Sequence, residues 1–301
     1  NAIESEGQSE DLPAKNKIDL GLPKLPEILA FDSDRNRTSP LAFTGDKFEF
    51  RAPGASQAMS VPVTALLSVW AAGLEEFMTL LEKRINNGEE PITAAVSVIR
   101  ELSIKSRKIR YEGDSYKNDW KEEAQKRGIV KGKTIPEGID LFVEPKTLDM
   151  LENISVFKRR EMEAFHTIRK EAFVKSNEVE MFILRDMIWE GVLPSISKQL
   201  LLEKSSYDML VGQKIENMEK WSAHITKLAE AKVFLIEKTQ ELVDLKEKLS
   251  EKDVHEHALG IVSEVVPLME EIRKMADSIE IYLSADNQFY PNYRSLFSLS
   301  S

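Results

Sequence analysis

The feature that most constrains the fold of this chain is a long tract of helical periodicity in its second half. Apolar residues recur at spacings of three and four through residues 157–204, 213–249 and 253–283, which is the pattern of amphipathic helices. The breaks between these stretches are short, so neighbouring helices are expected to run antiparallel. Pro194 lies inside the first stretch and should bend or interrupt it, because proline lacks the N–H that a helix interior uses. The sequence predicts a mainly α protein in which residues 145–301 form a three-helix bundle.

The first half of the chain is less regular. Residues 1–30 are polar and dotted with proline, and we expect a linker or arm there. Residues 31–144 begin with a turn-rich piece and a strand, and helical spacing then predicts helices over residues 63–85, 92–105 and 119–126. The sequence therefore divides into an arm, a mixed region and a helical region.

Composition excludes several classes of function. The chain has 41 basic and 51 acidic residues, a net charge of −10, which disfavours nucleic acid and anionic membranes as partners. It has no cysteine, so disulfides, thiolate nucleophiles and cysteine zinc sites are excluded and a cytoplasmic setting is expected. The longest apolar stretch, residues 61–74, is interrupted by Pro62, Thr64 and Ser68 and falls short of the roughly 18 residues of a membrane span.

A short strand carries the charged residues of greatest interest. Phe48-Glu49-Phe50-Arg51 alternates apolar and charged residues, which predicts a strand with Glu49 and Arg51 on one face. Magnesium-nucleotide enzymes need such a pair, since a carboxylate can bind the cation and a guanidinium can bind a carboxylate or phosphate. Lys47, Arg35 and Arg37 add positive charge nearby. The alternative is an ordinary surface ion pair.

The amino-acid sequence around this strand is specific to one family. Residues 36–51, Asn-Arg-Thr-Ser-Pro-Leu-Ala-Phe-Thr-Gly-Asp-Lys-Phe-Glu-Phe-Arg, resemble the active-site segment of type III glutamine synthetase, in which an Asn-Arg turn leads into a Phe-Glu-Phe-Arg strand. The resemblance continues at four further places, which are Tyr111-Glu112-Gly113-Asp114-Ser115-Tyr116, Val156-Phe157, Leu193-Pro194 and Tyr290-Pro291-Asn292-Tyr293. It implies that residues 31–144 are the C-terminal piece of the catalytic domain and residues 145–301 a helical extension.

The resemblance also implies roles for individual residues. Glu49 would bind the magnesium or manganese ion between nucleotide and glutamate, and Arg51 would hold glutamate and its phosphorylated form. Arg37 would neutralise the transferring phosphate, while Lys47 and Arg35 would contact the nucleotide. The family joins glutamate and ammonia with ATP as co-substrate and forms ring-shaped homo-oligomers, which implies a homo-oligomer here.

Two features depart from the family pattern. Commoner glutamine synthetases carry a second arginine five residues after the turn arginine, whereas this chain has Ala42. The family's other metal ligands, including a histidine, and its ammonium-site residues precede the region that this chain resembles. The chain also lacks an initiator Met and a signal-peptide layout, so we expect it to come from a longer gene product and to be inactive alone.

Other candidate sites are weaker. Asp32, Asp34 and Asn36 have the first spacings of a calcium loop, but Arg37 and Phe43 replace its glycine and glutamate. The histidines of His255-Glu256-His257 are expected on different faces of a solvated helix, and His166 and His224 are single and without supporting residues. No P-loop motif is present. Two hypotheses remain, which are part of a glutamate–ammonia ligase and a non-catalytic helical module for oligomerisation or partner binding.

Overall fold

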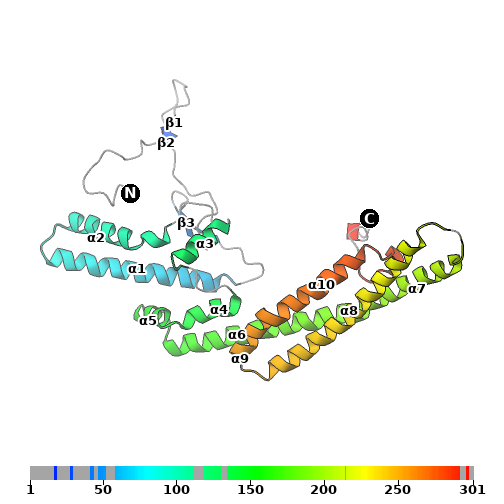
Figure 1. Cartoon of the computed structure of the whole chain (residues 1–301). Helices are drawn as coiled ribbons and strands as arrows, with labels where there is room; N and C mark the ends of the chain where they lie inside the picture. The colour runs from blue at the N-terminus through cyan, green and yellow to red at the C-terminus, as the bar shows by residue number, and fades with distance from the viewer. Residues whose placement is uncertain are drawn as a thin grey trace. The chain divides into compact units, whose positions relative to one another are not determined.

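A computed structural model describes nine stretches of the chain, namely residues 17–18, 28–29, 41–43, 47–51, 58–110, 118–129, 134–213, 215–291 and 296–297. The chain divides into two compact units, which are treated separately below. The first unit comprises Asn1–Lys133 and Leu141–Met162, and the second comprises Thr134–Asp140 and Glu163–Ser301. Most described residues are helical, so the predicted mainly α class is confirmed (Figure 1).

The first unit contains two small antiparallel sheets and several helices. Its elements are β1 (Lys17–Ile18), β2 (Ile28–Leu29), β3 (Leu41–Phe43), β4 (Phe48–Phe50), α1 (Ser60–Asn86), α2 (Pro91–Lys105), η1 (Arg107–Ile109), α3 (Asn118–Lys126), η2 (Leu141–Val143) and α5 (Pro145–Asn153). Strand β1 pairs with β2, and β3 pairs with β4. The predicted helices over 63–85, 92–105 and 119–126 are confirmed as α1, α2 and α3. The β1–β2 pairing lies within the segment expected to be an arm.

Helices α1 and α2 form an antiparallel hairpin. Its turn follows Asn87, where Gly88 has a positive φ of 93° that favours glycine. Glu90 caps α2 by accepting a hydrogen bond from the Thr93 backbone N–H at 2.9 Å, and Pro91 occupies the first turn. Ion pairs join the two helices along their length, because Glu76 of α1 pairs with Lys105 of α2 and Arg84 pairs with Glu101.

Helix α1 is long and apolar enough to cross a membrane by length and composition alone. The sequence argument had found no such stretch, because it counted only uninterrupted apolar residues. Helix α1 also makes the two ion pairs with α2 described above.

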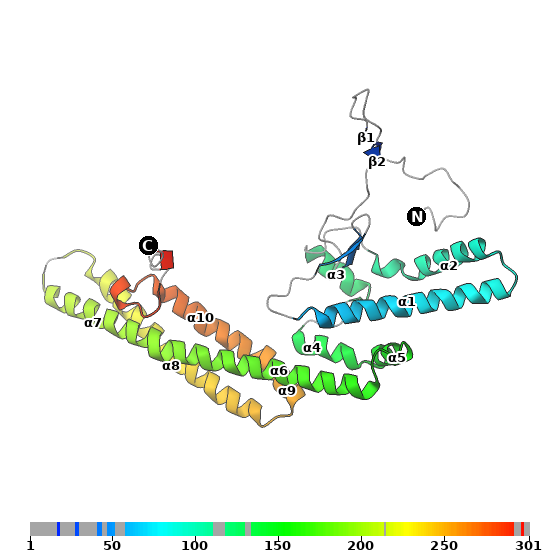
Figure 2. The same ribbon diagram turned by 180° about the vertical axis from the view of Figure 1, so that it is seen from behind.

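The second unit consists of long helices. Its elements are α4 (Ile135–Asp140), α6 (Arg159–Asp186, which begins in the first unit), η3 (Met187–Val192), α7 (Leu193–Leu210), α8 (Met218–Ser250), α9 (Val254–Gly260), η4 (Ile261–Val265), α10 (Val266–Glu280) and η5 (Ala285–Asn287). Figures 1 and 2 show α8 beside both α7 and α10 from opposite sides. The three predicted helical stretches are present, whereas their arrangement as a three-helix bundle stays a prediction.

The α-helical stretch is interrupted just before Pro194, as expected, although the chain stays helical. The chain widens into the π-helix η3 just before Pro194 and continues directly as α7. A wider turn accommodates proline, because the ring would clash with the carbonyl four residues earlier in an α-helix. Side chains satisfy the backbone carbonyls there, since the Ser195 hydroxyl donates to Gly191 O at 2.8 Å and the Tyr290 hydroxyl donates to Met187 O at 3.2 Å. The same device recurs at η4, which precedes Pro267.

The core of the second unit is drawn from all three helical stretches. Its buried apolar residues are Val174, Met181, Ile188, Leu193, Ile196, Leu228, Ala231, Leu235, Leu242, Leu249, Ala258, Ile261, Val265, Leu268, Ile272 and Ile279. Close approach at Gly260 is part of this packing, because a Cβ there would lie 2.4 Å from a Leu249 methyl carbon. Burial of this large apolar set is the main stabilising contribution to the unit.

Candidate functional site

Glu49 and Arg51 lie on the same face of β4, as the alternation predicted. The Arg51 guanidinium donates two hydrogen bonds to Glu49 Oε2, from Nη2 at 3.0 Å and from Nε at 3.3 Å. Lys47 Nζ lies 4.0 Å from the other carboxylate oxygen, Oε1. The Glu49 side chain is 42% exposed and that of Arg51 is 26% exposed, so neither is fully buried. The structure thus brings three of the five predicted site residues together.

The other two predicted residues, Arg35 and Arg37, lie outside the described residues. The register of β3 and β4 nevertheless clarifies the departure at Ala42. Ala42 is the direct cross-strand partner of Glu49. An arginine at position 42 would therefore stand directly across from Glu49, so this chain lacks a positive charge at the position opposite that residue.

Strand β4 is held in place by helix α1. The Phe48 ring packs edge-to-face on Trp70 of α1, with centroids 4.9 Å apart and an interplanar angle of 75°. Because side chains alternate along a strand, this contact uses one face of β4 and leaves Glu49 and Arg51 on the other. Phe48 thus contacts α1 while the charged residues lie on the other face of β4.

The charged groups of β4 fit one part of a metal and substrate site. Magnesium and manganese prefer carboxylate oxygens, and Glu49 supplies one carboxylate. Within the described stretches no cluster of three or more acidic or histidine side chains suits a metal ion. Glu49 has the chemistry of one metal ligand, and Arg51 has that of a fork that binds a carboxylate or phosphate.

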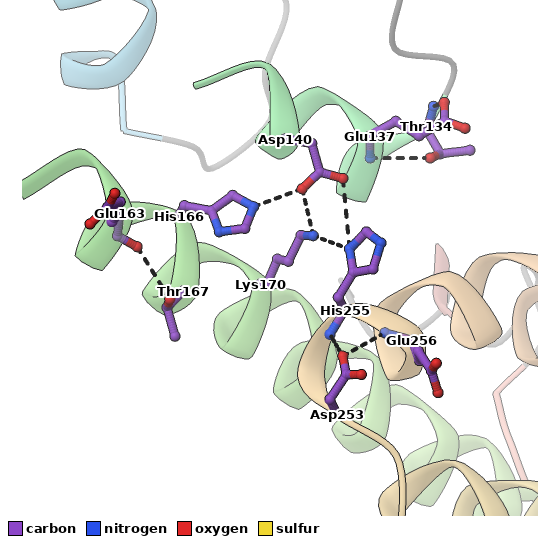
Figure 3. A network of polar contacts seen from close by, with 10 residues as sticks. All are labelled: Thr134, Glu137, Asp140, Glu163, His166, Thr167, Lys170, Asp253, His255 and Glu256. Carbon is purple, nitrogen blue, oxygen red and sulfur yellow. Dashed lines mark hydrogen bonds and ion pairs between the residues drawn. The ribbon is translucent and has the colours of Figure 1, made fainter. Parts of the chain in front are cut away.

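A second polar cluster lies in the helical unit and was not predicted (Figure 3). Asp140, at the end of α4, accepts hydrogen bonds from Lys170 Nζ at 2.5 Å and from His166 Nε2 at 2.7 Å. His255 Nδ1 of α9 contacts Lys170 Nζ and lies 3.8 Å from Asp140 Oδ2. The Lys170 side chain is only 1% exposed. The cluster, here called the Asp140 cluster, joins α4, α6 and α9.

The electrostatics of the Asp140 cluster favour the ionised carboxylate. Burial alone raises the pKa of Asp140, but hydrogen bonds from His166 and Lys170 and the nearby positive charges outweigh it and leave that pKa below its ordinary value. Asp253 caps α9 by accepting hydrogen bonds from the backbone N–H groups of His255 and Glu256, which lowers the pKa of Asp253.

Sequence reasoning missed this cluster because its contacts join distant residues, 26 apart for Asp140 and His166 and 85 apart for Lys170 and His255. His166, thought to be unsupported, is bonded to Asp140. His257, expected on a solvated face, is buried. One local signal was available, because Thr134 and Glu137 form a reciprocal capping box that begins α4, with N–H···O distances of 3.2 and 3.4 Å.

Comparison with known proteins gives a consistent result. The family model of the glutamine synthetase C-terminal domain matches residues 94–207. Glutamine synthetase of Bacteroides fragilis is 28% identical over 296 residues, which cover 94% of this chain and 40% of that protein. Type-3 glutamine synthetase of Dictyostelium discoideum is 29% identical over 299 residues, which cover 95% and 40%. Glutamine synthetase of Butyrivibrio fibrisolvens is 28% identical over 282 residues, which cover 89% and 38%.

The chain thus spans about two fifths of the length of the curated relatives it matches. The matched domain includes Asp140, His166 and Lys170, and the longer alignments cover nearly the whole chain. The resemblance found in residues 36–51 and the comparisons agree, because both liken this chain to a C-terminal part of glutamine synthetases, a type-3 enzyme among them.

Proposed function

We propose that this chain supplies one wall of a glutamine synthetase active site, in which ATP, glutamate and ammonia give glutamine through an acyl phosphate. The observation that carries the proposal is the pairing of Glu49 and Arg51 on one open face of β4. The names of the relatives support the same activity. Magnesium or manganese, when bound, would screen the nucleotide phosphates, and Glu49 would supply one of its oxygen ligands.

The roles of the basic residues follow from the charge of the reacting groups. Transfer of the γ-phosphoryl group to the glutamate side chain brings two anions together, so fixed cations lower the barrier. Arg51 would bind glutamate and then its acyl phosphate through the guanidinium fork. Arg37 would neutralise the phosphoryl group, and Lys47 and Arg35 would contact the nucleotide. Ammonia would then attack the acyl carbon and release phosphate.

The wall is not a complete site. One carboxylate cannot hold the metal alone, and the relatives have about three fifths of their length beyond what this chain spans. We therefore expect purified residues 1–301 to show no ATP-dependent glutamine formation. Magnesium-dependent turnover by this chain alone would contradict that part of the proposal.

The decisive experiment uses the full-length polypeptide, meaning this chain together with the part that its relatives add. Glu49→Ala should lower ATP-dependent glutamine formation by at least about a hundredfold, the effect of removing one group that stabilises transition-state charge. The matched control is Glu101→Ala, because Glu101 also pairs with an arginine at 3.0 Å and is similarly exposed. Near-normal turnover of Glu49→Ala would mean that Glu49 and Arg51 form an ordinary surface ion pair without a catalytic role.

The proposal also places the protein in the cytoplasm as a homo-oligomer. Support for self-association comes from α6, where Ile168, Val179 and Ile183 are exposed. By helical spacing they lie opposite the buried Val174 and Met181. Light scattering of purified chain with and without Ile183→Lys tests this contact, since a contact surface would not tolerate a buried charge. The same measurement tests the alternative of a purely oligomerising helical module.

A further inference from the structure

Helix α1 carries an apolar seam that the described residues of the chain do not cover. The seam consists of residues spaced alternately four and three apart, which are Leu67, Ala71, Leu74, Met78, Leu81 and Ile85. This spacing places all six on one face of the helix. The exposed fractions are 55% for Leu67, 56% for Leu74, 49% for Met78 and 37% for Ile85. Apolar surface of this extent marks an interaction site.

The seam lies away from the face of α1 that packs on α2, whereas Trp70 borders it, and α5 also contacts α1. Glu76 and Arg84 face α2 through their ion pairs, and Trp70 faces Phe48 of β4. Helix α2 adds an exposed stripe of its own with the same spacing, at Ile92, Val96 and Ile99. Within the described residues, β4 contacts α1 through Phe48 and Trp70, and most of the apolar seam of α1 stays exposed.

Two of the possible occupants fit poorly. To span a membrane, α1 would have to expose every face to lipid, but Glu75, Glu76, Glu82, Lys83 and Arg84 are spread around its second half. A second copy could pair antiparallel, with Leu74 opposite Met78 of the other molecule. That pairing would bring the two copies of Glu75 together beside the twofold axis, and like charges at this position oppose association.

We propose that the seam is the docking surface for the part of a glutamine synthetase polypeptide that this chain does not span. The inference rests on the proposed function. About three fifths of the relatives' length lies outside the matched region, which is ample to cover one helix hairpin. The remaining metal ligands must approach Glu49, and Phe48 ties that strand to α1. The segment that completes the site therefore meets α1 and presents apolar side chains to the seam.

The test compares two proteins that carry the same substitutions, Leu74→Glu with Met78→Glu. Both side chains are exposed in residues 1–301, so that chain should keep its unfolding midpoint and bind less of a hydrophobic dye such as anilinonaphthalene sulfonate. In the full-length polypeptide the two glutamates would be buried against an apolar surface, so the unfolding midpoint should fall by several degrees and dye binding should rise. Loss of soluble full-length protein, while the 1–301 variant stays folded, is the same result in stronger form.

The matched control is Leu201→Glu with Met209→Glu, two exposed apolar residues of α7. It should leave the unfolding midpoint of the full-length polypeptide unchanged. An equal fall for seam and control variants would overturn the inference, as would an unchanged midpoint for the seam variant. Two further results would overturn it in favour of another occupant, namely a discrete dimer of 1–301 that the seam variant abolishes, or seam-dependent sedimentation of 1–301 with phosphatidylcholine–phosphatidylglycerol vesicles.

Stability and dye binding do not depend on catalysis, so they separate the two proposals. If the seam variant is destabilised in the full-length polypeptide but Glu49→Ala keeps its turnover, the docking surface stands and the proposed role of Glu49 fails. If Glu49→Ala loses turnover but the seam variant is fully stable, the active-site wall stands and the docking surface fails.

Discussion

The Glu49–Arg51 pair of β4 and the Asp140–Lys170 pair of the helical unit are both a carboxylate bonded to a cation, yet they differ in what the cation can still do. Arg51 is 26% exposed and Glu49 42% exposed, whereas Lys170 is 1% exposed and its partner Asp140 is 35% exposed. An exposed pair contributes little to stability and its groups remain available to a ligand. A buried charge such as Lys170 needs its partner, because removal of that partner leaves an uncompensated charge in the interior. The difference supports our proposal that the first pair binds a ligand, and it indicates a structural role for the second.

The two pairs also differ in the elements that they connect. Arg51 and Glu49 are two residues apart on one strand, so their contact adds no tertiary constraint. Asp140, Lys170 and His255 come from α4, α6 and α9 (Figure 3). The short segment Thr134–Asp140 belongs to the second unit. The Asp140 cluster ties the last residue of this segment to α6 and α9.

The largest expected effect is on turnover. In the full-length polypeptide, Arg51→Ala should lower kcat/KM for glutamate by about 10²–10³, the usual cost of removing one group that stabilises the transition-state charge. Arg51→Lys should recover only part of this loss, because an ammonium lacks the bidentate fork. Asp140→Asn should stay within about twofold of wild type below its unfolding temperature, since we assign it no contact with substrate. Steady-state kinetics that show a greater loss for Asp140→Asn would reverse the assignment.

The next effect is on stability. Asp140→Asn should lower the free energy of unfolding of residues 1–301 by about 1–3 kcal/mol, because the buried Lys170 ammonium loses its carboxylate partner. Glu49→Gln should change it by less than about 0.5 kcal/mol, as for exposed pairs. Urea unfolding followed by circular dichroism measures both. Equal values for the two variants would remove the distinction between the pairs.

Acid should reveal the same distinction through the lowered pKa of Asp140. A carboxyl group whose folded pKa lies below its unfolded value of 3.8 stabilises the fold above that pH, and this contribution is lost as the pH falls through the folded pKa. The stability difference between wild type and Asp140→Asn should therefore be constant from pH 7 to about pH 5. It should shrink below pH 3.8. A difference that grows on acidification would contradict the ionised state of Asp140.

The smallest effect concerns His257. Burial lowers the pKa of His257 below 6.5, with Lys175 and Lys246 acting in the same direction and Glu178 acting against them. Below pH 6.5 the unfolded chain then binds a proton that the folded chain does not, so stability falls between pH 6.5 and the folded pKa. His257→Leu should flatten this decline. Urea midpoints at pH 7 and pH 5.5 for wild type and variant test it, and equal slopes would show that another group is responsible.

Much of the fold could be read from the sequence, because the signals were local. The spacing of apolar residues located α1, α2, α3 and the long helices, and alternation placed Glu49 beside Arg51. The interruption at Pro194 was predicted but its form was not, because a π-helix can accommodate a proline without ending the helix. Periodicity describes which face of a helix is apolar, but it does not specify the hydrogen-bond pattern within one turn.

The Asp140 cluster could not be read from the sequence for a different reason. Helix α4 has only six residues and includes Pro136 and Gly138, so it shows no periodicity. His166 and Lys170 are four apart and share a face, but nothing local indicates that Asp140 lies opposite them. Tertiary packing brings these residues together, and a single sequence carries no direct record of that packing.

The central claim is that Glu49 and Arg51 form one wall of a glutamine synthetase active site, with Glu49 as a metal ligand. The most direct test is the magnesium dependence of glutamine formation by the full-length Glu49→Gln variant. Loss of a charged ligand should raise the half-saturating magnesium concentration by about tenfold or more, with Glu101→Gln unchanged. A Glu49→Gln enzyme with wild-type rate and wild-type magnesium dependence would contradict the account.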